Sequence, residues 1–242
     1  MLNPYIRIIR PLHSDHFGQD HFFDTRYCTE TQSLIHSFHI IQNDFKKLFD
    51  YVELDVRNKD VFSHRIYELF LRTCTEFENC CTGILNDNGY TKSGHLNITD
   101  YFKINLASKL NEYEVKINVW SPSPLIFKPF EDWNSTTFSS LTWYQNYNDV
   151  KHNRSRNFHK ASLVNLIKAI GGLIVILASQ FGRIVFNPYQ PTMMIQKDND
   201  DFNSAQDSII SIKYPTWDVN EHILFDWDTL KLSPSPFLQY SF

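Results

Sequence analysis

The sequence is short of glycine and cysteine, and those present follow none of the spacings that common cofactor or metal sites require. Only seven glycines occur among 242 residues. They form no P-loop, no G-x-G-x-x-G turn and no G-x-S-x-G elbow. The four cysteines include no C-x-x-C pair. These absences argue against P-loop NTPases, dinucleotide-binding enzymes, α/β-hydrolases and zinc fingers, so we expect no cofactor and no metal.

The sequence also shows no features of a secretory signal peptide or of a membrane-spanning helix. The N-terminal residues MLNPYIRIIRPLH lack a continuous apolar stretch and a small-residue cleavage site. The longest apolar run, AIGGLIVILA at 169–178, is half the length of about 20 residues that a membrane helix needs. We therefore expect a soluble, cytoplasmic protein with no membrane contact. In it this run forms a core helix and the cysteines are buried free thiols.

Charge is low and aromatic content is high. The net charge of −4 excludes a generally basic nucleic-acid-binding surface but not a local basic groove. Phe, Tyr and Trp make up 15% of the residues. A chain of this length can bury about three quarters of its unfolded surface, so most of these rings are expected in the core.

Apolar residues recur at steps of three and four over 30–52 and 60–86, which predicts two long antiparallel helices. The second is expected to end at Asn86-Asp87-Asn88-Gly89. A third helix over 97–110 is expected to be capped by Asn97. Further helices are predicted over 141–156, capped by Ser139 or Ser140, and over 160–181, stopped by Gly182.

Strand patterns occur in two places. Residues 113–120 alternate and 125–127 can return beside them, which predicts a β-hairpin inserted near 113–130. Residues 209–214 and 223–227 are also strand-like. The predicted fold is mainly α: an antiparallel helical bundle over 1–182 with the inserted hairpin, followed by a mixed, irregular C-terminal segment over 183–242 that packs on the bundle.

Functional groups are densest between residues 148 and 160. On an unbroken helix, Asn148, His152, Ser155 and His159 share one narrow face, and Lys151 borders it. Arg154 joins them only if the helix breaks near 154–158. Imidazole, guanidinium and ammonium groups together can activate a ribose hydroxyl and hold a phosphate. The candidate catalytic residues are Arg154, His159 and His152, and the candidate substrate-binding residues are Asn148, Lys151, Ser155 and Arg156.

The string Arg154-x4-His159, placed before a long apolar helix, resembles the HEPN (higher eukaryotes and prokaryotes nucleotide-binding) superfamily. The resemblance covers about residues 28–181. It implies a metal-independent endoribonuclease of a toxin–antitoxin or phage-defence system, with an active site assembled by a homodimer. Arg154 would then bind or polarise the phosphate, and His159 would be the general acid or base. Ser155 departs from the Asn or Asp that is frequent in the superfamily, and His152 competes with His159 for the catalytic role.

Two other interpretations of the same face stay open. The face can bind a nucleic acid or a protein partner without catalysis, or it can be a solvated helical surface of a purely structural subunit. Glu76 is expected to meet a cation such as Lys151, His152 or Arg154, more as a structural ion pair than as a site residue. The histidine groups His13/His16/His21 and His36/His39 lack the additional ligands of a typical zinc site.

Overall fold

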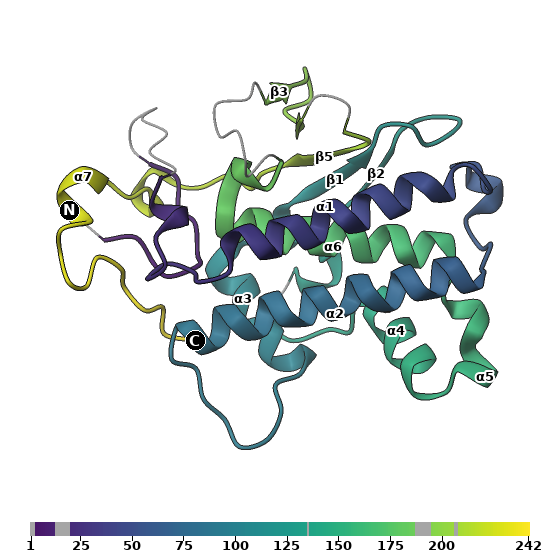
Figure 1. Ribbon diagram of the computed structural model, residues 1–242, viewed down its shortest axis with the longest axis horizontal. Helices are drawn as coiled ribbons and strands as arrows, with labels where there is room; N and C mark the ends of the chain where they lie inside the picture. The colour runs from purple at the N-terminus through teal and green to yellow at the C-terminus, as the bar shows by residue number, and fades with distance from the viewer. Residues whose placement is uncertain (1–2, 13–19, 135, 187–194, 206–207) are drawn as a thin grey trace.

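The computed structural model describes residues 3–12, 20–134, 136–186, 195–205 and 208–242, and the chain is mainly helical (Figure 1). About 52% of it is helical, which confirms the predicted class. The α-helices are α1 (Thr31–Leu48), α2 (His64–Asp87), α3 (Ile98–Ser108), α4 (Thr142–His152), α5 (Arg154–Asn157), α6 (Leu163–Phe181) and α7 (Trp227–Leu230). Short 3-10 helices connect them: η1 (Asp20–Phe23), η2 (Val56–Asn58), η3 (Leu110–Glu112), η4 (Glu131–Trp133), η5 (Phe158–Lys160), η6 (Gly182–Phe186) and η7 (Val219–Glu221).

The long helices α1, α2 and α6 pack against one another, with α1 and α2 antiparallel (Figure 1). Local sequence explains where α2 begins and ends. The Ser63 hydroxyl accepts the backbone N–H of Ile66 at 3.2 Å, which caps the first turn. The helix ends at Asp87, and Gly89 then takes a left-handed φ of 76°. The predicted end of this helix is confirmed, as is the Asn97 cap of α3, which forms a capping box with Asp100.

Helix α6 is the central apolar element. Every residue from Ala169 to Phe181 is buried. Together with η6 it forms a stretch, Leu163–Phe186, that is long and apolar enough to cross a membrane, but 94% of its most apolar window is buried inside the protein. Gly171 and Gly172 allow close packing, since a Cβ at either position would lie 3.0 Å or less from the rings of Phe127 and Trp143. The apolar run predicted as a core helix is therefore a core helix.

One antiparallel sheet joins the middle of the chain to its C-terminal part. Its strand order is β2-β1-β5-β4-β3. The strands are β1 (Glu114–Ile117), β2 (Leu125–Phe127), β3 (Gln196–Lys197), β4 (Asn203–Ser204) and β5 (Ile210–Lys213). The predicted hairpin is present, with Val115 opposite Phe127. On its other side Val115 lies opposite Ile212 of β5. The hairpin and the C-terminal segment, which the sequence suggests as separate additions, thus form one sheet.

Three local predictions are wrong. Residues 223–227 form no strand: Ile223 makes one isolated bridge with Leu12, and α7 begins at Trp227. The region 141–156 is not one helix, because α4 ends at His152 and α5 restarts at Arg154. The residue that precedes α4 is Leu141, and no serine side chain caps the helix.

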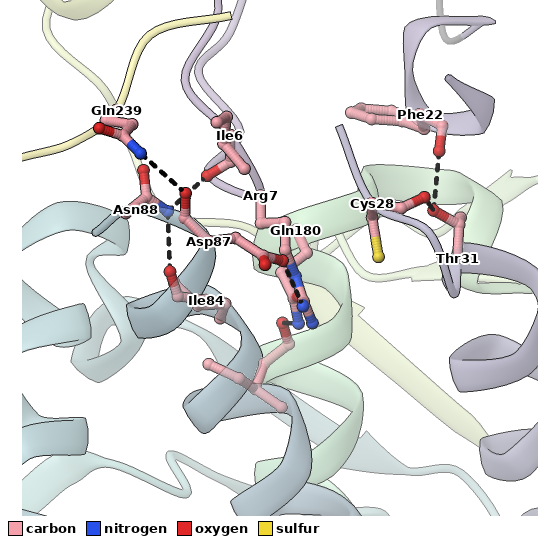
Figure 2. A network of polar contacts seen from close by, with 11 residues as sticks. Ile6, Arg7, Phe22, Cys28, Thr31, Ile84, Asp87, Asn88, Gln180 and Gln239 are labelled. Atoms are coloured by element: carbon pink, nitrogen blue, oxygen red, sulfur yellow. Dashed lines mark hydrogen bonds and ion pairs between the residues drawn. The ribbon is translucent and has the colours of Figure 1, made fainter. Parts of the chain in front are cut away.

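A buried arginine connects the N-terminal segment to the ends of α2 and α6 (Figure 2). Arg7 is 5% exposed and donates through Nε to Gln180 Oε1 at 2.8 Å and through Nη1 to Asp87 Oδ2 at 2.9 Å. Next to it, Asn88 Nδ2 donates to the Ile6 carbonyl at 2.9 Å. These bonds fix Ile6 and Arg7 against the end of the helical layer that lies opposite α5.

Candidate site on α4, α5 and η5

The segment that carries the predicted site residues lies at the end of the molecule opposite the chain N-terminus (Figure 1). Its backbone breaks at Asn153, where φ is −146° and ψ is 71°. Asn148 and His152, four residues apart within α4, keep the helical register. Ser155 and His159 lie beyond the break, so the single narrow face expected for an unbroken helix is not formed. The break that Arg154 requires to join the other residues is present.

Side chains on both sides of the break hold this shape. The Lys160 ammonium lies 2.6 Å from the carboxylate of Asp149 in α4. Asn157 Nδ2 donates to the carbonyl oxygens of Asp149 and Asn153 at 3.0 and 3.1 Å. The Ser155 hydroxyl donates to Asn153 Oδ1 at 2.9 Å. These short-range bonds brace the loop, and they engage Ser155 and Lys160 within the chain.

The inner face of α4 is attached to α2 through Glu78. Its carboxylate accepts the hydroxyls of Tyr144 at 2.6 Å and Tyr147 at 3.2 Å, and Lys151 Nζ lies at 3.5 Å. Lys151 also donates to the Tyr147 hydroxyl at 2.9 Å. Burial, followed by the contact with Glu78, raises the pKa of Tyr144 well above its usual range. The hydrogen bond to Tyr147 raises the pKa of Lys151. Lys151 therefore belongs largely to a contact between helices.

Glu76 does not meet the cation that the sequence predicted for it. Glu76 is half-buried, and burial raises its pKa, with Arg72 as the nearest opposing charge. The carboxylate that meets Lys151 is Glu78, two residues further along α2. A sequence signal for this contact exists: Tyr144, Tyr147 and Lys151 follow helical spacing, so their polar tips point to one place on the facing helix.

The outer surface of the segment carries the remaining candidates. His152, Arg154, Arg156 and His159 are exposed, and Asn148 is half-buried. Within the described residues, the side chains of His152, Arg156 and His159 form neither an ion pair nor a hydrogen bond. The Arg154 guanidinium lies over the Tyr67 ring of α2, 5.7 Å from its centroid, which is a cation–π contact at the outer limit of range.

Aromatic rings lie beside these cations. Phe158 packs edge-on against Phe62 and Tyr67, at centroid distances of 5.5 and 5.7 Å, and lies 4.8 Å from the His64 ring. Phe62 remains 47% exposed. The structure thus places a third exposed imidazole, His64, beside the predicted segment. Sequence reasoning missed it because His64 is about 90 residues away and reaches Phe158 only through tertiary packing.

In one chain the predicted residues form an exposed basic surface. None of them lines the cavity that the described residues enclose elsewhere in the molecule. The described residues also contain no group of three or more side chains that could hold a metal ion. His13 and His16 lie outside the described residues. His21 packs among aromatic rings such as Phe22 and Tyr27, and His39 Nε2 lies 3.0 Å from the Val185 carbonyl.

Comparisons of the chain with protein-family models, curated proteins and solved structures gave no match. Any function for this surface must therefore be argued from its chemistry.

Proposed function

We propose that the protein is a HEPN-like, metal-independent endoribonuclease and that a second copy of the chain completes its active site. The observation that carries the proposal is the group of exposed imidazole and guanidinium side chains, His152, Arg156 and His159, that have no ion pair or hydrogen bond within the described residues. Such groups are free to act on a phosphodiester. The helices that pack around α6 would then correspond to the bundle of that superfamily.

The chemistry assigned to each residue follows from its functional group. Arg154 binds a non-bridging phosphate oxygen through its planar fork. One imidazole, His159 or its counterpart in the second chain, takes the proton of the ribose 2′-hydroxyl as that oxygen attacks phosphorus. Another returns a proton to the leaving 5′-oxygen, which produces a 2′,3′-cyclic phosphate. Asn148, Lys151, Ser155 and Arg156 surround this position and would contact the RNA, with His152 as the alternative base.

The proposal includes a dimer because the candidate residues are exposed in one chain, and a second chain would enclose the phosphodiester. Two such surfaces facing each other would place histidines and arginines on both sides of the RNA and exclude water from it. The exposed Phe62 ring and the neighbouring Phe158 ring offer stacking partners for unpaired bases. Single-stranded RNA or the loops of transfer RNA are the substrates that such stacking favours.

The test is the cleavage of a pool of single-stranded RNA and transfer RNA in excess EDTA. Wild type is expected to cut, and Arg154→Ala and His159→Ala are expected to lose cleavage while staying folded by circular dichroism. His95→Ala removes an exposed imidazole from the loop between α2 and α3 and serves as the matched control with unchanged activity. If wild type leaves every RNA intact, the nuclease proposal is refuted.

A second candidate is a binding module without catalysis, in which the exposed His152, Arg156 and His159 contact a nucleic acid while the other cations stay engaged within the chain. Lys151, Lys160 and Arg154 each have a partner within the chain, namely Glu78, Asp149 and the Tyr67 ring. Fluorescence polarisation with labelled RNA distinguishes the two candidates. Binding that weakens steeply with salt, without cleavage, supports the module. If the protein neither binds nor cleaves RNA, a structural role remains for this surface.

A further inference from the structure

A cavity of about 450 Å³ lies between the N-terminal segment, the end of α6 and the C-terminal part of the sheet. The segments that form it lie toward the N-terminal end of the molecule, away from α5 (Figure 1). Its volume falls in the range of about 300–1,000 Å³ that is typical of small-molecule sites. It is therefore separate from the surface proposed for RNA, and it has room for a ligand of its own.

Polar atoms without partners are concentrated in the residues that line this cavity. Five buried side-chain nitrogen or oxygen atoms of the described residues lack a hydrogen-bond partner. Three of them, Arg10 Nη1, Asn203 Oδ1 and Tyr214 Oη, belong to cavity-lining residues. Buried polar groups in folded proteins are nearly always hydrogen-bonded. Three of the five unpaired atoms thus belong to residues around one cavity, where a bound molecule would supply partners that the chain itself does not.

The lining is strongly cationic in a protein whose overall charge is negative. Among the described residues, Arg10, Arg183, Lys197 and Lys213 line the cavity together with one carboxylate, that of Asp201. Lys197 pairs with Asp201 at 2.7 Å, which neutralises one charge on each side. The nearby carboxylate of Glu221 is not part of the lining and pairs with Lys109 at 2.7 Å. The excess of positive charge favours a ligand with more than one negative charge.

Aromatic rings supply another part of the wall, beside aliphatic and proline side chains, and orient the key cation. The Arg10 guanidinium stacks over the Trp217 ring at 4.2 Å from its centroid. Stacking fixes the plane of the guanidinium, whose paired N–H groups match the oxygens of a phosphate. The rings of Tyr113 and Tyr214 lie 5.6 Å apart along the same wall. Burial raises the pKa of Tyr214, so its hydroxyl stays protonated and can donate at neutral pH.

We infer that this cavity binds a small aromatic phosphate of the size of a nucleoside monophosphate. Arg10 and Tyr214 donate to the phosphate oxygens, and Lys213 supplies further positive charge. The aromatic wall contacts the ring of the ligand, and the Asn203 carbonyl oxygen accepts from an exocyclic or ring N–H. A simple carboxylate satisfies fewer of the cations, and a ring without an anion leaves Arg10 unpaired. This binding site does not depend on the nuclease proposal.

The test is isothermal titration calorimetry of the full chain with adenosine, guanosine, cytidine and uridine monophosphates. The matching nucleosides, inorganic phosphate and phenylacetate are titrated in parallel. At least one monophosphate is expected to bind at one site per chain, about tenfold or more tighter than its nucleoside, inorganic phosphate or phenylacetate. The inference is overturned if no monophosphate binds saturably, or if phenylacetate or the nucleoside binds as tightly.

Variants connect the binding to the named atoms. Tyr214→Phe removes one hydroxyl and keeps the ring, and it is expected to weaken binding by about tenfold, the loss of one hydrogen bond to a charged group. Arg10→Lys keeps the charge but loses the fork, with a similar loss expected. Tyr51→Phe, at an 85% exposed position, is the matched control. Unchanged affinity in folded Tyr214→Phe and Arg10→Lys would overturn the site. Arg154→Ala is expected to bind normally, whatever the outcome of the RNA assay.

Discussion

Replacing Gly83 by alanine is expected to destabilise the protein, although alanine is the better helix former. Gly83 lies inside α2, where the exchange alone would gain about 1 kcal/mol. A Cβ at this position would lie 2.1 Å from Arg7 Nη1, and 2.8 and 2.9 Å from Cζ and Nη2. The guanidinium would have to move, and it is buried and held by Gln180 and Asp87. The effect therefore depends on the cost of displacing Arg7.

The magnitude follows from those two hydrogen bonds. A hydrogen bond to a charged group contributes about 1.5–3 kcal/mol. The Asp87 side chain is 46% exposed, which places its bond with Arg7 at the lower end of that range. The loss of about 3 kcal/mol exceeds the helical gain, so the free energy of unfolding is expected to fall by about 2 kcal/mol. For a chain of this size the melting temperature falls by about 4–8 °C. Thermal unfolding followed by circular dichroism measures both.

The decisive comparison is made in an Arg7→Ala background. Arg7→Ala is itself destabilising, because Gln180 loses its buried partner. Without the guanidinium the three atoms closest to the new methyl group are gone, so Gly83→Ala is expected to stabilise this variant by about 1 kcal/mol. The sign of the effect reverses between the two backgrounds, with a coupling of about 3 kcal/mol. The reasoning is refuted if Gly83→Ala changes stability by the same amount and in the same direction in both.

Three further predictions test other parts of the fold. The hydrogen bonds that Arg57 donates to Asp55 lower the pKa of that carboxyl to about 2. Because its unfolded pKa is about 3.9, this stabilisation is present above about pH 4 and is lost as the pH falls through about 2. The difference in melting temperature between wild type and Asp55→Asn should close over that window, and a constant difference would contradict it. Gly171→Ala places a Cβ 2.8 Å from the Phe127 ring and should lower the free energy of unfolding by about 1 kcal/mol, overpacking outweighing helix propensity; a higher melting temperature would disprove the close contact. All four cysteines are buried, and burial raises the pKa of Cys74, Cys80 and Cys81. A thiol reagent should therefore modify them only after denaturant is added, and rapid modification of the native protein would argue against this packing.

The sequence predicted well where a short stretch of chain decides the outcome. The ends of α2 and the cap of α3 depend on residues within four positions, such as Ser63, Gly89 and Asn97. The hairpin of β1 and β2 is also local. The break at Asn153 is different, since Lys160 and Asn157 fold back on α4 and Phe158 packs on α2. That combination of local bonds and a distant contact has no periodic signature.

The candidate site was predictable as a list of chemical groups but not as an arrangement. The residues between 148 and 160 are adjacent in the chain, so their closeness followed from the sequence alone. The division of α4 into an inner face held by Glu78 and an outer basic face depends on which helix lies opposite. His64 became part of the surface for the same reason.

Local physical chemistry in the sequence therefore determined the helical class, the ends of α2, the start of α3, the buried helix α6 and the chemical groups of the candidate site. Hydrophobic spacing, capping and turn residues act over a few positions, and each can be recognised without knowledge of the rest of the chain. Only the tertiary structure decided that β5 pairs with β1, that Arg7 joins the ends of α2 and α6, and that Arg10, Asn203 and Tyr214 surround one cavity. These contacts join residues about 80 to 200 positions apart, and no local preference specifies which of many compatible partners meet. Their selection comes from packing the whole chain around one core.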